Sequence, residues 1–157
     1  MTIKHKKISF NRLETNEPIP YDLLLLADPS KILVDTYLKE SDVYIARHNE
    51  NVVGVIVLFP LTPDTVEIKN VGVKPEVQGE GIGSYLIENV IKIAKQNKQK
   101  KVFIGTANSS VGQLYLYQKH GFEISRIKHN YFIENYTELI YENGIQAKHL
   151  LILKMEL

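Results

Sequence analysis

Three glycines spaced two residues apart stand in the middle of the chain, where they could hold a phosphate group. They are Gly79, Gly81 and Gly83; a β-branched run ends just before them, and an apolar pattern with helical spacing starts just after them. Glycine permits positive φ angles and lets a ligand approach the backbone closely. The first N–H groups of a helix lack intrahelical acceptors and lie at the positive end of its dipole. Strand, glycine loop and helix start therefore predict a site for the phosphate or pyrophosphate of a nucleotide-like cofactor.

The spacing of these glycines separates three phosphate-binding patterns. A P-loop requires Lys-Ser or Lys-Thr after its glycines, and neither follows here. A dinucleotide fingerprint has the spacing Gly-x-Gly-x-x-Gly and an acidic residue about twenty positions on, where this chain has Lys101. The third pattern, Gln/Arg-x-x-Gly-x-Gly/Ala, matches residues 78–83 in full. On this match the chain resembles the GNAT superfamily of acyl-CoA-dependent N-acetyltransferases. Taken alone, the loop could also be a strand-to-helix turn without a ligand.

A second block downstream strengthens the resemblance. Residues 117–122 read Tyr-Gln-Lys-His-Gly-Phe, similar to the Tyr-x-x-x-Gly-Phe ending of the family's second motif. In the common form of that motif an asparagine stands seven residues before the tyrosine, whereas Asn108 stands nine residues before Tyr117. The segment before this helix would therefore carry two extra residues. The likeness covers nearly the whole chain and is best over residues 43–130.

The resemblance implies acetyl-CoA as cosubstrate, without a metal. In the family, the strand before the loop splays away from its neighbour, and its free backbone groups pair with the pantetheine like an added strand. Val71, Gly72 and Val73 would have this role. Asn108 would position the pantetheine or adenine portion through its side-chain amide. Backbone amides of the loop would hold the pyrophosphate, and the loop residues so assigned are Gln78, Gly79, Glu80, Gly81, Ile82, Gly83 and Ser84.

Acetyl transfer to an amine needs a base for the amine and benefits from a proton for the leaving thiolate. A phenol is protonated at neutral pH and can donate, and the resemblance assigns Tyr117 as this general acid. The alternative is a tyrosine that packs in the protein core from an amphipathic helix, and this is the role that we expect for Tyr115.

Glu67 is the candidate base, because it lies on the strand that leads into the glycine loop. Several family members use a glutamate at the matching strand position, and many others use a water chain. Period-two alternation predicts that Glu67, Lys69, Val71 and Val73 share one face of the strand. The alternative role for Glu67 is a structural ion pair with Lys69 or with a lysine of a neighbouring strand.

Composition excludes other classes of function. The 157 residues, 44% apolar and 24% charged, suit one globular domain spanning residues 1–157. A net charge of +1 gives no support for a nucleic-acid or anionic-membrane partner. The absence of cysteine excludes a thiolate metal site and a cysteine nucleophile, and no histidines stand at a metal-ligand spacing. No apolar run approaches the roughly 20 residues of a membrane span, and the polar N-terminus lacks the apolar core of a signal peptide, so we expect a cytoplasmic protein.

The hydrophobic pattern predicts an α+β fold of mixed α/β type. We expect a three-layer, GNAT-like arrangement, in which a mostly antiparallel mixed sheet of six to seven strands carries helices on both faces. Pro60 should end a buried strand, Ser30 should cap the second helix, and residues 128–146 should form a long loop. Strands are expected at 3–9, 43–47, 52–59, 65–73, 100–105, 122–127 and 149–155, and helices at 21–27, from Ser30, from the glycine loop to Gln96, and at 110–119.

The acceptor site is the least specified feature. The resemblance places it between the first helix pair, residues 20–39, and the segment 128–146, whose aromatic and acidic residues would suit a cationic amine or polyamine. A packed surface lid is the alternative for this segment. We therefore predict an N-acetyltransferase that acetylates a primary amine of a small molecule and that could form a homodimer. An enzyme acting on protein N-termini or lysines and a non-catalytic acyl-CoA sensor are the alternatives.

Overall fold

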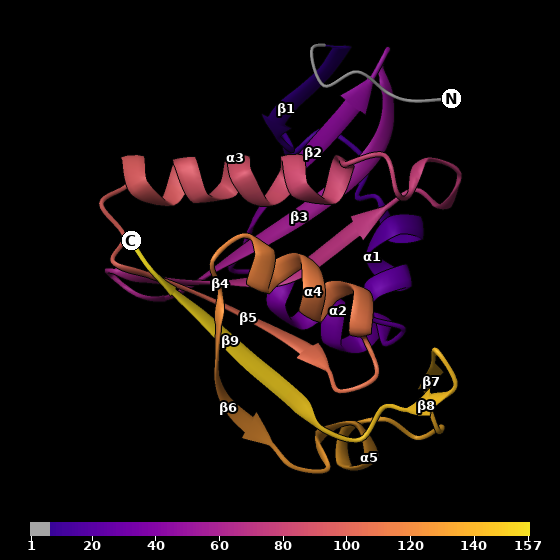
Figure 1. The fold of residues 1–157 in the computed structure, drawn as a ribbon. Coiled ribbons are helices and arrows are strands. Elements are labelled where there is room, and N and C mark those ends of the chain that lie inside the picture. The colour runs from indigo at the N-terminus through magenta and orange to yellow at the C-terminus, as the bar shows by residue number, and fades with distance from the viewer. Residues whose placement is uncertain (1–6) are drawn as a thin grey trace.

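A seven-stranded sheet forms the centre of this computed structural model, which describes residues 7–157 (Figure 1). The strand order is β1-β2-β3-β4-β5-β9-β6. Neighbouring strands are antiparallel except β4 and β5, which are parallel. The strands are β1 (Ile8–Arg12), β2 (Asp42–His48), β3 (Asn51–Thr62), β4 (Thr65–Val73), β5 (Lys101–Ala107), β6 (Glu123–Lys128) and β9 (Leu150–Glu156), and a separate hairpin is made by β7 (Tyr141–Glu142) and β8 (Ile145–Gln146).

Helices cover both faces of the sheet, which confirms the predicted fold class (Figure 1). On one face, α1 (Tyr21–Ala27) and α2 (Lys31–Leu38) bury Leu23, Leu24 and Val34 against β2 and β3. The Ser30 hydroxyl accepts a hydrogen bond from Leu33 N at 3.3 Å and caps α2 as predicted. On the other face lie α3 (Ile82–Gln96) and α4 (Val111–Lys119). Helix α3 buries Ile82, Leu86, Ile87, Val90 and Ala94 at the spacing of one helical face.

Two predictions about strand ends are corrected. β3 passes through Pro60 and ends at Thr62, because the pairing with β4 is irregular between these residues, and an irregular position tolerates the missing N–H of proline. The first strand is Ile8–Arg12 and so extends beyond the predicted end at residue 9. Residues 3–6 of the predicted strand lie outside the described residues.

The predicted long loop 128–146 is also corrected, since it contains a short helix and a hairpin. The helix is α5 (Tyr131–Asn135). In the β7–β8 hairpin, Asn143 and Gly144 have φ angles of 54° and 73° and form its two-residue turn. Asn-Gly is the strongest short hairpin signal, so the sequence indicated this turn, and the prediction missed it.

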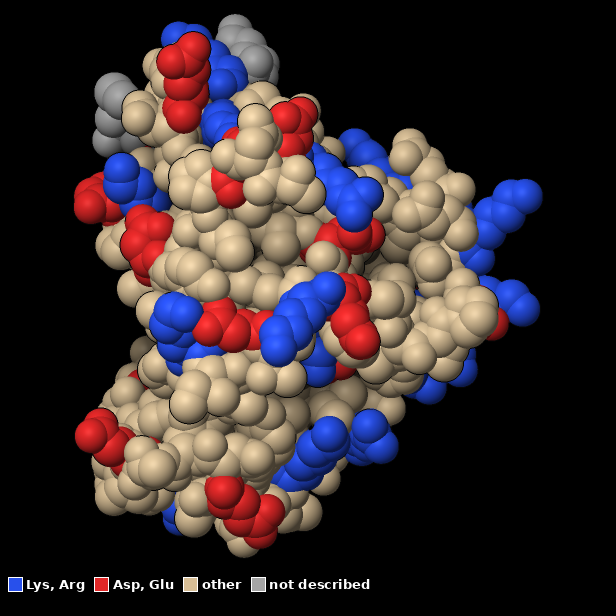
Figure 2. Space-filling view, turned by 180° about the vertical axis from the view of Figure 1, so that it is seen from behind, with Lys and Arg blue, Asp and Glu red and all other residues tan. Residues whose placement is uncertain are grey.

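The face of the molecule opposite to the view of Figure 1 carries mixed charge. Figure 2, which views the molecule from behind, shows Lys and Arg interspersed with Asp and Glu rather than gathered in one patch. Within residues 7–157, no helix has the length and apolar character to cross a bilayer.

Candidate active site

β4 and β5 are paired only along their first halves. Thr65–Ile68 of β4 lie opposite residues 101–104 of β5, and this pairing stops at Ile68 and Ile104. Beyond this point β4 pairs with β3 and β5 with β9, and the two strands diverge (Figure 1). Among the described strands none pairs with the facing edges of residues 69–73 and 105–107. Apart from the Val73 carbonyl, which accepts a hydrogen bond from the Gln78 side chain, these edges present strand-unpaired N–H and C=O groups to an extended ligand, as the predicted splay requires.

A β-bulge at Lys69 marks the start of the splay. Val57 lies opposite Asn70, but the next residue, Leu58, lies opposite Ile68, so β4 has one extra residue. The bulge reverses the alternation of side chains. Val71 and Val73 therefore pack on the same side as Ile68, against the core under α3 and α4. The prediction that Glu67 shares a face with Val71 and Val73 is wrong for this reason.

The glycine loop connects the splayed end of β4 to α3. The short helix η2 (Pro75–Val77) precedes it, and the Gln78 side chain donates a hydrogen bond to the Val73 carbonyl at 3.0 Å, which ties the loop to the strand. Gly79 and Gly81 have φ angles of 80° and 88°, in the left-handed region that favours glycine.

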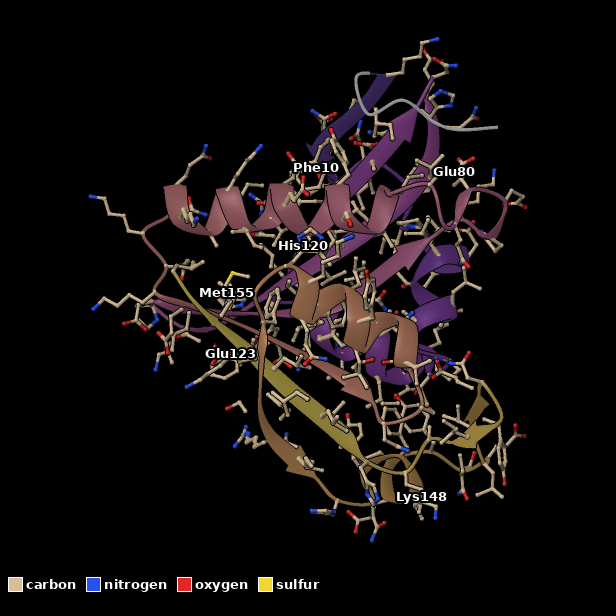
Figure 3. All side chains as sticks on the ribbon, viewed as in Figure 1. Phe10, Glu80, His120, Glu123, Lys148 and Met155 are labelled. Atoms are coloured by element: carbon tan, nitrogen blue, oxygen red, sulfur yellow. The ribbon has the colours of Figure 1, made fainter. Side chains whose placement is uncertain are left out.

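The start of α3 leaves backbone N–H groups free to bind an anion. The first α-helical hydrogen bond runs from Tyr85 N to the Gly81 carbonyl at 3.0 Å, so the N–H groups of residues 82–84 precede it. A Cβ at Gly79 would find no atom within 4 Å, which means the loop is open on that side. Figure 3 shows Glu80 beside this end of the helix. The N–H groups of residues 82–84 and the open side of the loop at Gly79 match an anion cradle.

Two further contacts fix the elements around the loop. His120 Nε2 lies 3.0 Å from the Ser84 hydroxyl, and Figure 3 places His120 between α3 and α4. This hydrogen bond joins the first turn of α3 to the end of α4. At Gly72, a Cβ would lie 2.4 Å from the Leu23 carbonyl oxygen, so glycine is required for α1 to pack this close to β4.

Tyr117 lies on the buried face of α4, whereas Tyr115 is 67% exposed, so the expectation that Tyr115 is a core residue is wrong. Only 5% of Tyr117 is exposed, and its ring meets Phe122 edge to face with centroids 6.2 Å apart. Burial raises the pKa of the phenol above its ordinary value, so the group stays protonated in the physiological range. Gly121, with φ of 99°, ends the helix as the sequence predicted, and Phe122 N donates back to the Tyr117 carbonyl at 3.0 Å.

Glu67 forms an ion pair with Lys69, with 3.0 Å between Oε2 and Nζ. Both side chains are partly buried, and the Lys69 ammonium also lies 5.3 Å from the centre of the Phe59 ring. The structural pairing considered as the alternative for Glu67 is therefore present. It leaves a carboxylate beside the splay, on the face that carries α1 and α2.

Asn108 holds the backbone that leads into β9. Its Oδ1 accepts hydrogen bonds from the N–H groups of Lys148 (2.8 Å) and His149 (3.0 Å), and its Nδ2 donates to the Gln146 carbonyl (3.1 Å). These bonds stabilise the segment after the β7–β8 hairpin. They assign Asn108 a structural role that the sequence did not indicate, while its predicted contact with the cofactor remains a prediction.

A cluster of tyrosines and polar groups lies between α1, α2, β4 and α5. The Tyr136 hydroxyl donates to Asp28 Oδ1 at 2.8 Å, and buried Asn70 donates to the Tyr37 hydroxyl at 2.9 Å. The pKa of Tyr131 is raised by burial and by the charges of Asp28 and Glu67, so both carboxylates act on this phenol. We call Asp28, Tyr37, Asn70, Tyr131 and Tyr136 the tyrosine cluster.

Residues 11–122 match the Acetyltransferase (GNAT) family. The chain belongs to this family. The uncharacterized N-acetyltransferase YvbK of Bacillus subtilis strain 168 is 46% identical over 144 residues, which are 92% of each chain. A GNAT family acetyltransferase from Elizabethkingia anophelis, solved with acetyl-CoA bound, is 50% identical and has a TM-score of 0.94 over 96% of this chain and 99% of that chain. An acetyltransferase of Bacillus subtilis solved in complex with CoA is 44% identical, with a TM-score of 0.90 and the same coverage.

The GNAT fold brings most of the predicted residues to the ends of β4 and α3. The backbone of residues 71–73 lines the splay, and the glycine loop continues directly from it. The Ile82 side chain is buried in the core, which leaves only its backbone for a ligand. The sequence did not single out Asp28, Tyr37 or Asn70, because their contacts join residues far apart in the chain. Residues 7–157 hold no group of three His, Cys, Asp or Glu side chains that could bind a metal ion.

Proposed function

We propose that this GNAT N-acetyltransferase transfers the acetyl group of acetyl-CoA directly to the primary amine of a small cationic molecule. The observation that carries the proposal is the splay of β4 from β5 at Ile68, which opens directly onto the glycine loop. At the splay, the unpaired strand edges suit the two amides of pantetheine. At the glycine loop, the helix N-terminus and two glycines with positive φ suit a pyrophosphate.

Acetyl transfer forms a C–N bond and breaks the C–S bond of the thioester. In our proposal Glu67 takes the proton that the attacking amine loses, and the Tyr117 hydroxyl gives a proton to the departing thiolate. Tyr117 then regains its proton from solvent, and Glu67 releases the one it took. Acetyl-CoA supplies the activated acetyl group, so no covalent enzyme intermediate is needed.

The tyrosine cluster supports a cationic acceptor. Asp28 and Glu67 bring two carboxylates near Tyr131, and aromatic rings with carboxylates attract ammonium groups. The stacked rings of Phe132 and Tyr136, 5.5 Å apart, extend the aromatic surface along α5. An amine carrying a second positive charge fits these groups better than a neutral amine does, because that charge would find a carboxylate partner.

A thiol-release assay over a panel of acceptors tests the proposal. The panel pairs each diamine with a monoamine of equal length and includes peptides with a free N-terminus or a lysine, with acetyl-CoA hydrolysis as the background. We expect diamines to be acetylated with the highest kcat/KM. Turnover of peptides alone would replace the small-molecule proposal with a protein substrate. Binding of acetyl-CoA in calorimetry without turnover of any amine would contradict the enzymatic proposal.

A further inference from the structure

β6 is a sheet edge that no other element of the described chain covers. It is the last strand in the sheet order and pairs only with β9. All six of its residues are exposed, including Ile124 at 50% and Ile127 at 46%. In Figure 1 its outer side is open along its length, and α4 approaches only its first residues. An open edge with exposed isoleucines can pair with another strand.

A bulge in β6 places the two isoleucines on the same face. Residues three apart in a regular strand point to opposite faces. Here Ile124 lies opposite Leu153 and Ile127 opposite Leu151, and the register shifts at Ser125 between them. Leu151 and Leu153 both pack on the α3–α4 side of the sheet. Ile124 and Ile127 therefore share that face, and Glu123 and Lys128 share the opposite one.

The strand sequence Glu-Ile-Ser-Arg-Ile-Lys is complementary to itself when it is read antiparallel. In a pair centred between Ser125 and Arg126, Glu123 of one copy lies opposite Lys128 of the other. Ile124 then lies opposite Ile127, and both contacts occur twice because the pair is symmetric. A two-fold axis perpendicular to the sheet leaves each face of the sheet on the same side in both copies. Residues that lie opposite each other must then share a face, and the bulge puts Ile124 and Ile127 on one face.

We propose that β6 pairs antiparallel with β6 of a second copy of this chain in that register. Opposite charges and apolar side chains both meet their partners there, whereas a shift of one residue along the strand separates both pairs. β9 and β5 lie between β6 and the splay, so both candidate active sites stay open in the dimer. Because the contact is small, we expect dissociation in the micromolar range.

Sedimentation of the full chain from about 1 to about 200 µM tests the dimer and its register. Glu123→Lys places two lysines opposite each other at both ends of the pair, and it should weaken the dimer on the order of tenfold. Lys128→Glu should act alike, and the double variant should restore wild-type affinity. Glu138→Lys makes the same charge change at an exposed site outside β6 and should have no effect. A wild-type monomer at the highest concentration, or a double variant without rescue, would overturn the proposal.

Cysteine cross-linking tests the register independently, because the chain has no cysteine of its own. Ile124→Cys mixed with Ile127→Cys should form a disulfide between chains on mild oxidation, since directly opposite residues meet disulfide geometry. Either variant oxidised alone should remain largely uncross-linked, because like residues lie several positions apart. Cross-linking of the single variants with none in the mixture would contradict this register. Retained acetylation by each variant shows that the chain is folded.

Discussion

Glu67 and Lys69 form an ion pair of 3.0 Å on the strand that leads into the splay. The bulge that follows directs Asn70 toward Tyr37 and α1, and turns Val71 to the opposite face. The pair therefore lies on the face that carries the tyrosine cluster. In our proposal this face is where Glu67, as the base, would take the proton of an incoming amine.

Replacing Glu67 with glutamine should reduce kcat/KM for the amine on the order of 10²- to 10³-fold, because the general base is lost. The acidic limb of the pH–rate profile should disappear with it. KM for acetyl-CoA should change little. Glu76→Gln is the matched control, since Glu76 lies exposed on η2 and makes the same change of charge. An unchanged profile would leave Glu67 as the structural partner of Lys69 and assign proton removal to water.

Tyr117→Phe should keep the fold and lower kcat by about 10- to 100-fold. The ring contact with Phe122 survives the change, and only the proton donor is removed. The variant should still bind acetyl-CoA in calorimetry with wild-type affinity. If kcat stays at the wild-type level, the hydroxyl does not donate to the leaving thiolate, and Tyr117 acts in packing alone.

The same tyrosine should make the protein less stable in alkali. Burial raises the pKa of Tyr117, and burial together with nearby Asp28 and Tyr131 raises the pKa of Tyr37 to about 12. The unfolded chain releases these protons near pH 10. Their contribution to the free energy of unfolding is therefore complete below pH 10 and is lost as pH rises through the pKa values of the folded state. The free energy of unfolding measured in urea should fall above pH 10, for Tyr117 by at most about 1.4 kcal/mol per pH unit.

Tyr117→Phe should flatten that slope, whereas Tyr115→Phe should not. Tyr115 is 67% exposed on the same helix, so it provides the control for loss of a hydroxyl. Equal slopes in the two variants and the wild type would contradict the role of burial.

The glycine loop and α3 could be predicted from the sequence because both depend on local chemistry. Glycine spacing selects the turn, and Ile82, Leu86 and Val90 repeat at the period of a helix that buries one face. Tyr117 could be placed for the same reason, since Gly121 marks the end of its helix. The catalytic and cofactor roles of these residues came from resemblance, because no local pattern specifies a thioester.

The bulge at Lys69 and the contacts of Asn108 could not be predicted in this way. A bulge depends on how two strands are paired, and the sequence of β4 alternates regularly up to Val73. Asn108 bonds backbone groups about forty residues away, and its sequence position says nothing about them. The tyrosine cluster could not be predicted either, since Tyr136 and Asp28 meet only because the fold places α5 beside the end of α1.

Three glycine substitutions should separate packing from backbone conformation. Gly72→Ala should destabilise most, by about 2 kcal/mol or more, because its Cβ would lie 2.4 Å from a backbone oxygen that cannot move freely. Gly79→Ala has open space but a φ of 80°, so it should cost about 1 kcal/mol and raise KM for acetyl-CoA. Gly112→Ala, in open space on α4, should stabilise by about 0.5–1 kcal/mol. Urea unfolding and acetyl-CoA kinetics measure these effects, and a wild-type KM in Gly79→Ala would remove the loop from cofactor binding.

Asp28→Asn should reveal the charge of the acceptor. Asp28 Oδ1 accepts hydrogen bonds from the Tyr136 hydroxyl and from Ser30 N at 3.1 Å, and asparagine keeps an oxygen there while removing the negative charge. If the acceptor carries an ammonium beside the tyrosine cluster, its KM should rise about tenfold or more, with KM for acetyl-CoA unchanged. Asp35→Asn removes a charge from neighbouring α2, where Asp35 pairs with Lys31, and should leave both constants alone. An equal rise in KM for diamines and monoamines in Asp28→Asn would mean that Asp28 supports the backbone at Ser30 and the Tyr136 side chain rather than the substrate. Only a charge contact distinguishes the two kinds of amine.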